Sequence, residues 1–285
     1  MMIDFHPDDK RLLLYHFDST TSTQDEAKRI AEAFSDSNDE QPFETFCVTT
    51  TSQSSGRGTS GRQWLGAPGN IFVTIGIPMA TWMKQTASVP LTLLPLKIGT
   101  LTAQLVQALL EECRLEKDSN QKDLDPFVTV KWPNDVLCDG NKISGTLIES
   151  ANGWFLIGVG INLEYAPKIP TTGANHGRSS TSVRDYCSIT NRSDAGEDDE
   201  KRQRYERAHR AGVELAYKLH SWLHIESDVS AKTSDSILGG WQQFVDWDME
   251  LVMRDTPNRE RVKLVDVLPD GRVKVKNVND GTRRS

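Results

Sequence analysis

The stretch from Thr45 to Leu110 contains no Asp or Glu, in a chain of 285 residues that carries 40 of them and has a formal net charge of −7. Two runs of apolar and β-branched residues within this stretch, 46–50 and 70–77, predict strands. The segment between them, 51–64, is polar and rich in glycine, which predicts a loop. Any fold of this chain must therefore place a carboxylate-free, glycine-rich loop between two strands.

The loop combines two arginines, Arg57 and Arg62, with three glycines, Gly56, Gly58 and Gly61. Glycine tolerates positive φ, so the backbone can turn successive N–H groups inward beside the two guanidinium groups. Such a loop can bind an anion. An alternative, in which the glycines only form a flexible turn and the arginines face solvent, accounts for the loop equally well on its own.

Residues 56–61 also match the pattern G-x-G-x-x-G of dinucleotide-binding and kinase loops. A dinucleotide-binding loop leads into a helix and is followed about 20 residues later by an acid. Here a strand follows the loop, and the next carboxylate is Glu111. Kinase, Walker, G-x-S-x-G and H-E-x-x-H motifs are missing from the sequence, and its six His are scattered along the chain. We therefore predict neither a metal cluster nor a histidine-activated nucleophile.

Two further segments place polar groups next to predicted strands. Lys131 and Asp135 flank a Trp-Pro turn, and Lys142 starts the following strand. Later, two glycines end an apolar strand just before Asn162, where they can let a ligand approach the backbone. The alternative for the first segment is a hairpin with polar surface residues. The alternative for the second is a strand bulge. We expect the two cations and the carboxylate to converge.

The overall pattern predicts an α+β protein, with a mixed β-sheet, flanking helices and a small all-β module at the end. Helices are predicted over 22–34, 89–115, 208–223 and 237–244, and strands over 127–132, 142–150 and 154–163. We divide the chain into a large domain, 1–245, with a loop insertion expected near 166–200, and a β module, 246–285. The charge run 188–211 is expected to be a solvated loop and helix face.

Five motifs stand in one order: Ser-Thr-Gln-Asp-Glu-Ala (22–27), the Gly-Arg-Gly to Trp loop (56–64), Lys-Trp-Pro-Asn-Asp (131–135), Lys-Ile-Ser-Gly (142–145) and Gly-Val-Gly-Ile-Asn (158–162). In this order and spacing the chain resembles the biotin protein ligase, or biotin-[carboxylase] ligase, family. The resemblance is close over about residues 15–165 and loose elsewhere. Each motif is weak alone, whereas the set is specific.

The resemblance implies a class II synthetase-like mixed sheet with a C-terminal SH3-like module. It also implies a two-step reaction: biotin and Mg²⁺-ATP form biotinyl-5'-AMP and pyrophosphate, and the biotinyl group then passes to one lysine of a biotin carboxyl carrier domain. The biotin carboxylate must approach the α-phosphate, so cations and oriented N–H groups are needed where the two anions meet. No protein nucleophile is needed.

The resemblance also assigns roles to the matching positions. The catalytic residues would be Arg57, Arg62, Asp135 and Lys142. Biotin would contact Ser22, Thr23, Gln53, Gly56, Arg57, Lys142, Gly145 and Gly158. The nucleotide would contact Arg62, Trp64, Lys131, Asn134, Lys142 and Asn162. No residue is assigned to a metal, because Mg²⁺ would be carried by the ATP phosphates.

Three points in this assignment stay open. Ser19 and Thr20 are an alternative to Ser22 and Thr23, which we prefer because Asp-Glu-Ala-Lys follows them. Thr59 and Ser60 stand where family members often carry further basic residues, so we expect the loop to close less tightly over the adenylate. The last strand of the β module, expected after 279–281, is predicted to be missing, which would leave the module incomplete.

Two other functions stay open: a lipoate ligase, which usually has an Arg-Arg-x-Ser-Gly-Gly-Gly loop, and a non-catalytic biotin sensor. A DNA-binding repressor is not expected, because 21 residues precede Ser22 and the net charge is negative. We expect a monofunctional, cytoplasmic monomer or weak homodimer, without a targeting peptide. No apolar run is expected to reach the roughly 20 residues of a membrane span. The four Cys lack a CxxC pair and are expected to be reduced thiols.

Overall fold

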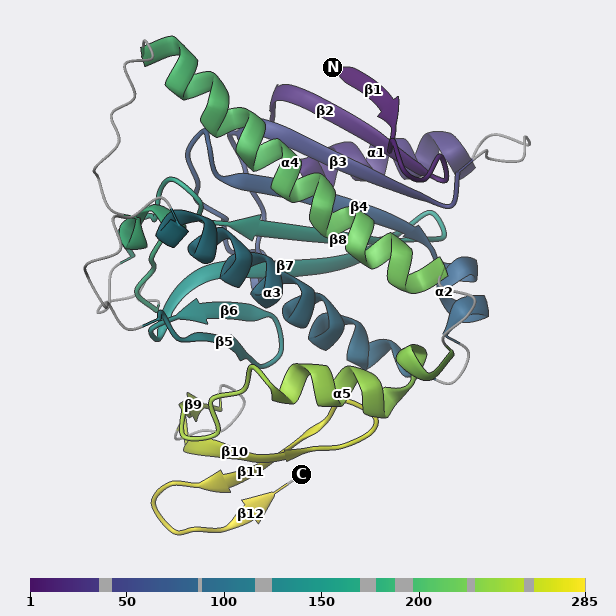
Figure 1. Cartoon of the computed structure of the whole chain (residues 1–285). Helices are drawn as coiled ribbons and strands as arrows, with labels where there is room; N and C mark the ends of the chain where they lie inside the picture. Colours follow the sequence, from purple (N-terminus) through teal and green to yellow (C-terminus); the bar gives the residue numbers. More distant parts are fainter. Residues whose placement is uncertain are drawn as a thin grey trace.

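The computed structural model describes residues 1–35, 43–86, 89–115, 125–169, 178–187, 197–224, 229–253 and 259–284. Its main sheet contains the strands β1 Met2–Phe5, β2 Leu12–Thr20, β3 Thr45–Gln53, β4 Ile71–Pro78, β5 Val128–Lys131, β6 Asp135–Cys138, β7 Asn141–Ala151 and β8 Trp154–Ile161. The strand order is β1-β2-β3-β4-β8-β7-β6-β5 (Figure 1). Only the β2–β3 pair of this sheet is parallel, so the predicted α+β class with a mixed sheet is confirmed.

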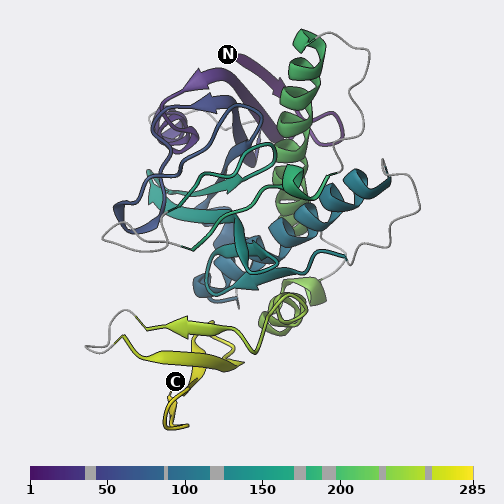
Figure 2. The ribbon, with the colours of Figure 1, turned by 90° about the vertical axis from the view of Figure 1, so that its left-hand side faces the viewer.

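Five helices and four short 3-10 helices accompany the strands in the described residues. They are α1 Thr23–Ser35, α2 Met79–Gln85, α3 Leu94–Leu115, α4 Glu197–His224, α5 Ser234–Gln242, η1 Thr59–Gly61, η2 Leu91–Leu93, η3 Val183–Tyr186 and η4 Val229–Lys232. α3 and α4 cover one face of the sheet, and α1 covers the opposite face (Figure 2). The predicted helices are confirmed, although α4 begins at Glu197 rather than at 208.

Alternation along the strands gives each face its own core. In β3, Cys47 belongs to the large core under α3 and α4, whereas Phe46 and Val48 belong to a smaller cluster under α1. Successive side chains of a strand point to opposite faces. By the same alternation Val73 of β4 faces α3 and α4, so its neighbour Thr74 faces the α1 side. This face carries the site described below.

Three strands of the main sheet were not predicted from the sequence. β1 is four residues long and largely exposed, β2 ends in an exposed polar stretch, and β6 has four residues. Such strands lack the extended alternation on which a sequence-based prediction depends. Their hydrogen bonds come from neighbours already in the sheet.

The long helix α3 shows that hydropathy alone does not distinguish a buried core helix from a membrane-spanning one. The expectation that no apolar run approaches a membrane span is wrong for Leu91–Arg114, which is long and apolar enough by composition. In this protein 72% of the apolar 18-residue window within that stretch is buried. Its apolar residues form the core between the sheet, α4 and α5, which explains their number.

A second sheet follows α5 and contains β9 Glu250–Val252, β10 Arg261–Val267, β11 Val273–Asn277 and β12 Arg283–Arg284. The prediction that the last strand is missing is wrong, because Arg283 and Arg284 pair with β11. A two-residue strand gives no periodic signal in the sequence. The module is joined to the main sheet by a hydrogen bond of 3.3 Å from Trp132 Nε1 to the Gly271 carbonyl oxygen.

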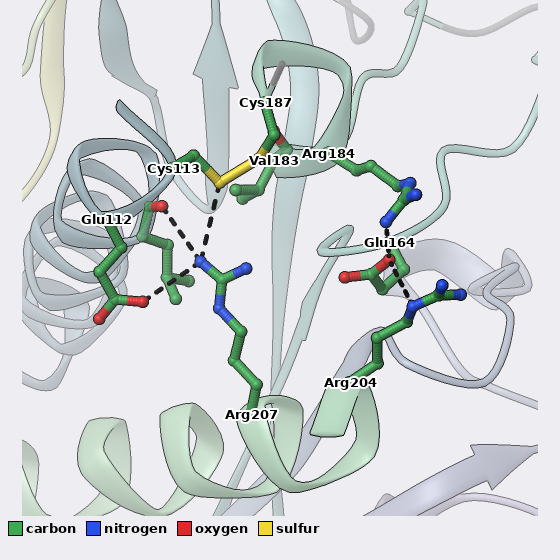
Figure 3. The surroundings of a disulfide bond; sticks show 9 residues. Glu112, Cys113, Glu164, Val183, Arg184, Cys187, Arg204 and Arg207 are labelled. Atoms are coloured by element: carbon green, nitrogen blue, oxygen red, sulfur yellow. Dashed lines mark hydrogen bonds and ion pairs between the residues drawn. A yellow bond between two sulfur atoms is a disulfide. The ribbon is translucent and has the colours of Figure 1, made fainter. Parts of the chain in front are cut away.

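Two of the four cysteines form a disulfide, which corrects the prediction of four reduced thiols. Cys113 of α3 is bonded to Cys187, just after η3, with their Cα atoms 5.1 Å apart (Figure 3). Cys47 and Cys138 are free and buried. The bonded pair is separated by 74 residues, so only the folded chain brings it together. The remainder of the predicted insertion, 170–177 and 188–196, lies outside the described residues.

Candidate active site

A cavity of about 710 Å³ lies on the α1 side of the sheet. It is lined by the start of α1, the end of β3 with the following loop, and β4, β7 and β8. The predicted site residues that line it are Ser22, Thr23, Gln53, Arg57, Arg62, Trp64, Asn134, Lys142, Gly145, Gly158 and Asn162. Arg57, Arg62 and Lys142, which had to meet for the sequence-based hypothesis to hold, therefore share one cavity.

Three predicted residues, Gly56, Lys131 and Asp135, are not among those that line the cavity. Gly56 packs behind the wall, where an added Cβ would lie 2.5 Å from Gln53 Nε2 and 2.5 Å from the Trp64 carbonyl oxygen. Its role is therefore to let the loop approach Gln53. Lys131 and Asp135 lie behind Lys142, where Asp135 pairs with both lysines.

The alternative pair Ser19 and Thr20 does not reach the cavity either. Both residues belong to β2, and the Thr20 hydroxyl donates to Glu26 at 2.5 Å. Ser22 and Thr23 form the start of α1, where Ser22 Oγ accepts a hydrogen bond from Gln24 N at 3.2 Å. The helix start thus carries two side chains into the cavity wall.

Lys142 is held by the hairpin of β6 and β7. Its Nζ lies 2.6 Å from Asp135 Oδ1, while Lys131 Nζ lies 3.8 Å from Asp135 Oδ2. The Lys142 backbone is fixed from the other side, since its N–H donates to Ser179 and its carbonyl accepts from Thr181. Asp135 therefore orients Lys142 at the cavity edge rather than facing the cavity itself.

Trp64 lies on two strand glycines beside Lys142. An added Cβ at Gly145 would lie 3.0 Å from the indole, and one at Gly160 would overlap it. Lys142 Nζ is 5.5 Å from the ring centroid, which is a cation–π distance. The glycines of β7 and β8 thus make room for an aromatic ring, and Trp64 Nε1 is buried without a hydrogen-bond partner in the described part of the chain.

The two loop arginines have different surroundings. Arg57 bridges two carboxylates, with Nη1 2.6 Å from Asp25 Oδ1 and Nη2 paired with Glu149. Arg62 folds back on its own loop, where Nη2 donates to Thr59 Oγ1 at 2.7 Å. The loop contains no carboxylate of its own, but the fold places Asp25 and Glu149 next to it. Thr59, which replaces a basic residue of the family pattern, has become a partner of Arg62.

Asn162 is almost fully buried and keeps one polar atom unused. Its Nδ2 donates to the Thr181 carbonyl at 3.1 Å, while Oδ1 has no hydrogen-bond partner among the described residues. An amide oxygen can bind Mg²⁺ or a donor group of a ligand. Asn134 also lines the cavity and donates to the Thr146 carbonyl at 2.8 Å. These amides suit a magnesium held mainly by phosphate oxygens, and the described residues contain no cluster of three or more His, Cys, Asp or Glu suited to a resident metal.

Sequence reasoning missed several residues of the cavity wall: Gln24, Phe72, Thr74, Gly160, Arg178 and Ser180. Gln24 follows directly after the predicted Ser-Thr pair, and Phe72 and Thr74 alternate with core residues of β4. That alternation was the available signal, since it puts the two side chains on the face opposite α3. Nothing in the sequence indicated Arg178 and Ser180.

A model described as "Biotin/lipoate A/B protein ligase family" matches residues 16–165. A biotin–[acetyl-CoA-carboxylase] ligase of Mycobacterium tuberculosis is 31% identical over 123 residues, which are 41% of this chain and 38% of that protein. The matched regions span between 38% and 53% of the length of the curated relatives.

Two solved structures share the fold. The biotin protein ligase of Leishmania major in complex with biotinyl-5-AMP is 24% identical, with a TM-score of 0.56 and coverage of 95% of this chain and 96% of that one. The biotin protein ligase of Aquifex aeolicus in complex with biotin and ATP is 19% identical, with a TM-score of 0.55 and coverage of 95% and 97%. Both likenesses extend over the main sheet and the C-terminal module.

Proposed function

The chain belongs to the biotin/lipoate A/B protein ligase family, and we propose that it is a biotin protein ligase. It would activate biotin with ATP to biotinyl-5'-AMP and transfer the biotinyl group to a lysine of a carboxylase's carrier domain. The observation that carries the proposal is the single cavity in which Arg57, Arg62 and Lys142 meet the polar group of Ser22, Thr23 and Gln53. The three cations suit two anionic groups, a carboxylate and a phosphate. The three uncharged polar side chains suit a polar ring.

The cavity suits an acyl adenylation by its charges. The approach of a carboxylate to an α-phosphate brings two negative charges together, and a cation held between them lowers the barrier. Lys142, oriented by Asp135, supplies that cation, and Arg62 supplies a second one for the phosphates. Asn134 and Asn162 would face the phosphates and their magnesium ion, which adds further charge neutralisation when bound.

Transfer needs no residue of this chain as a nucleophile. The amine of an incoming lysine attacks the mixed anhydride, and AMP leaves. We assign Asp135 no direct part in this step, because it is paired with Lys131 and Lys142 and is not among the residues that line the cavity.

The proposal extends to partners and setting. We propose a cytoplasmic ligase without DNA binding, because ATP is supplied in the cytoplasm and a net charge of −7 gives no general attraction to nucleic acid.

The test is ATP-dependent transfer of biotin to a purified carrier domain by the full chain, compared with transfer of lipoate. We expect biotin transfer that requires ATP and is lost in Lys142→Ala. Transfer of lipoate alone would assign the chain to the other branch of the family. Binding of biotin without pyrophosphate release would indicate a sensor.

A further inference from the structure

We propose that Thr74 and Gln24 fix the direction of the hydrogen bond that Thr23 offers to a ligand, so that this wall selects a ring N–H. The inference rests on the proposed function and names the group by which the cavity would recognise its substrate. Thr74 and Gln24 are buried, with exposed fractions of 0% and 3%. Both also line the cavity, and the role inferred for them here is to position the Thr23 hydroxyl.

The orientation of the Gln24 side chain is determined by a backbone carbonyl. Its Nε2 lies 3.1 Å from the Leu156 carbonyl oxygen. A carbonyl can only accept, so the amide nitrogen must face it and Oε1 must point away. At Gly158 an added Cβ would lie 2.6 Å from Oε1, so only glycine leaves the amide its place. Gln24 Oε1 is therefore a fixed acceptor.

Thr74 connects the Gln24 acceptor to Thr23 and thereby determines the direction of the hydrogen bond between the two hydroxyl groups. Thr74 Oγ1 lies 3.1 Å from Gln24 Oε1 and 2.9 Å from Thr23 Oγ1. A hydroxyl group has one hydrogen. Because Gln24 Oε1 can only accept, the Thr74 hydrogen goes to Gln24, and Thr23 must donate its own hydrogen to Thr74. The Thr23 oxygen then has only lone pairs left for the cavity, and it accepts an N–H from a ligand.

The neighbouring residues offer the opposite polarity. Gln53 Oε1 lies 3.4 Å from the Thr23 N–H, which leaves Gln53 Nε2 as a donor. Ser22 Oγ already accepts from Gln24 N at 3.2 Å, so its hydrogen is available for donation. One acceptor beside two donors complements the N–H and C=O groups of a cyclic urea. A dithiolane ring has neither group.

The test compares biotin with its two cyclic carbamate analogues, in which oxygen replaces one or the other ureido N–H. In the parent protein we expect one carbamate to bind about tenfold or more weakly than biotin, because two acceptors then face each other. Thr74→Val frees the Thr23 hydroxyl to donate, so the ratio of the two Kd values should fall to about threefold or less. Thr74→Ser keeps the hydroxyl and should keep the parent ratio.

Gln24→Met provides a second route, because it removes the acceptor and leaves Thr74 intact. It should also lower the ratio, and thermal unfolding shows whether each variant is folded. A purely structural role would weaken biotin and carbamate equally. The inference would be overturned if the parent protein bound biotin and both carbamates equally well. It would also be overturned if folded Thr74→Val and Gln24→Met variants kept the parent ratio of Kd values. A parent that binds no biotin would instead contradict the proposed function.

Discussion

Asp135 Oδ1 lies 2.6 Å from Lys142 Nζ, across the hairpin of β6 and β7. The carboxylate is mostly buried, with a side-chain exposure of 17%, and of its two lysine neighbours only Lys142 lines the cavity. Asp135 therefore lies between one cation that lines the cavity, Lys142 of β7, and another that does not, Lys131 of β5. This arrangement makes the two lysines a matched pair for experiments.

Lys142→Ala should reduce adenylate formation about a hundredfold or more, because it removes the cation from the place where the two anions meet. Lys131→Ala, which removes the other lysine paired with Asp135, should cost much less. The measurement is biotin-dependent release of pyrophosphate from ATP. Equal losses in the two variants would mean that the role of Lys142 is wrongly assigned.

Asp135→Asn should lower kcat about tenfold, because Lys142 loses the charged partner that orients it. Since Asp135 acts through Lys142, the double variant should be no slower than Lys142→Ala alone. Pyrophosphate release from the four proteins of this cycle gives the coupling directly. Losses that simply add would indicate an independent role for Asp135.

Arg57→Lys should raise the KM for biotin about tenfold, because one ammonium group cannot pair with both Asp25 and Glu149 as the guanidinium does. The free energy of unfolding should change by less than about 1 kcal/mol, since these pairs are partly exposed. Arg29→Lys is the control, because Arg29 pairs with Glu26 on the outer side of α1. An unchanged KM in Arg57→Lys would remove Arg57 from the binding surface.

The sequence predicted the site well where the signal was local. The glycine-rich loop, the strands β3 and β4 on either side of it and the start of α1 each show a pattern within a few residues. In the loop, Gly56 was expected to contact the ligand, but it is not among the residues that line the cavity and packs instead against Gln53. Local pattern thus identified the position without its contacts.

Partners distant in sequence could not be predicted in this way. Glu149 pairs with Arg57 across 92 residues, and Cys113 is bonded to Cys187 across 74. Such pairs depend on the strand order and on where η3 meets α3, and neither is encoded in a single segment. The same applies to Thr74, whose hydroxyl is hydrogen-bonded to Gln24, 50 residues away in the sequence.

Cys113→Ser should lower the free energy of unfolding by about 2–4 kcal/mol under oxidising conditions, because the bond no longer restricts the unfolded chain. The parent should lose a similar amount when a reductant is added, and the variant should not respond. Thermal unfolding with and without reductant measures both. Cys47→Ala is the control, since Cys47 is a free buried thiol and its loss should leave the response to reductant intact.

Thiol counting tests the same bond independently. Unfolded protein that has not been reduced should react at two of its four cysteines, and reduced protein at all four. Four reactive thiols before reduction would show that the bond does not form.

Five of the six histidines, scattered in the sequence, come together where α4 meets the N-terminal strands and the start of β3. The edge of one ring faces the other in the pair His209 and His16, with ring centroids 4.4 Å apart, and the rings of His220 and His224 are tilted against each other at the same centroid distance of 4.4 Å. His6 stacks on Tyr217 of α4. Burial lowers the pKa of both His209 and His224 from 6.5 to about 4. The contact is thus built from neutral imidazoles.

This contact should make stability fall as the solution becomes acidic. Above pH 6.5 the histidines are neutral in both states, so the full stability is present. Below pH 6.5 the unfolded chain takes up protons that folded His209 and His224 do not accept until about pH 4, which favours unfolding. Between pH 6.5 and 5, where most carboxylates are still ionised, urea unfolding should therefore show a steady loss of stability.

The double variant His209→Gln, His224→Gln should flatten this pH dependence, because glutamine does not titrate. Gln can still form a hydrogen bond with Thr49, which His209 Nδ1 contacts at 2.9 Å, so the packing of α4 is largely retained. Activity at pH 7.5 should stay close to that of the parent, since both histidines lie on the face of the sheet opposite the cavity. A variant whose stability falls between pH 6.5 and 5 as steeply as that of the parent would mean that other groups carry the effect.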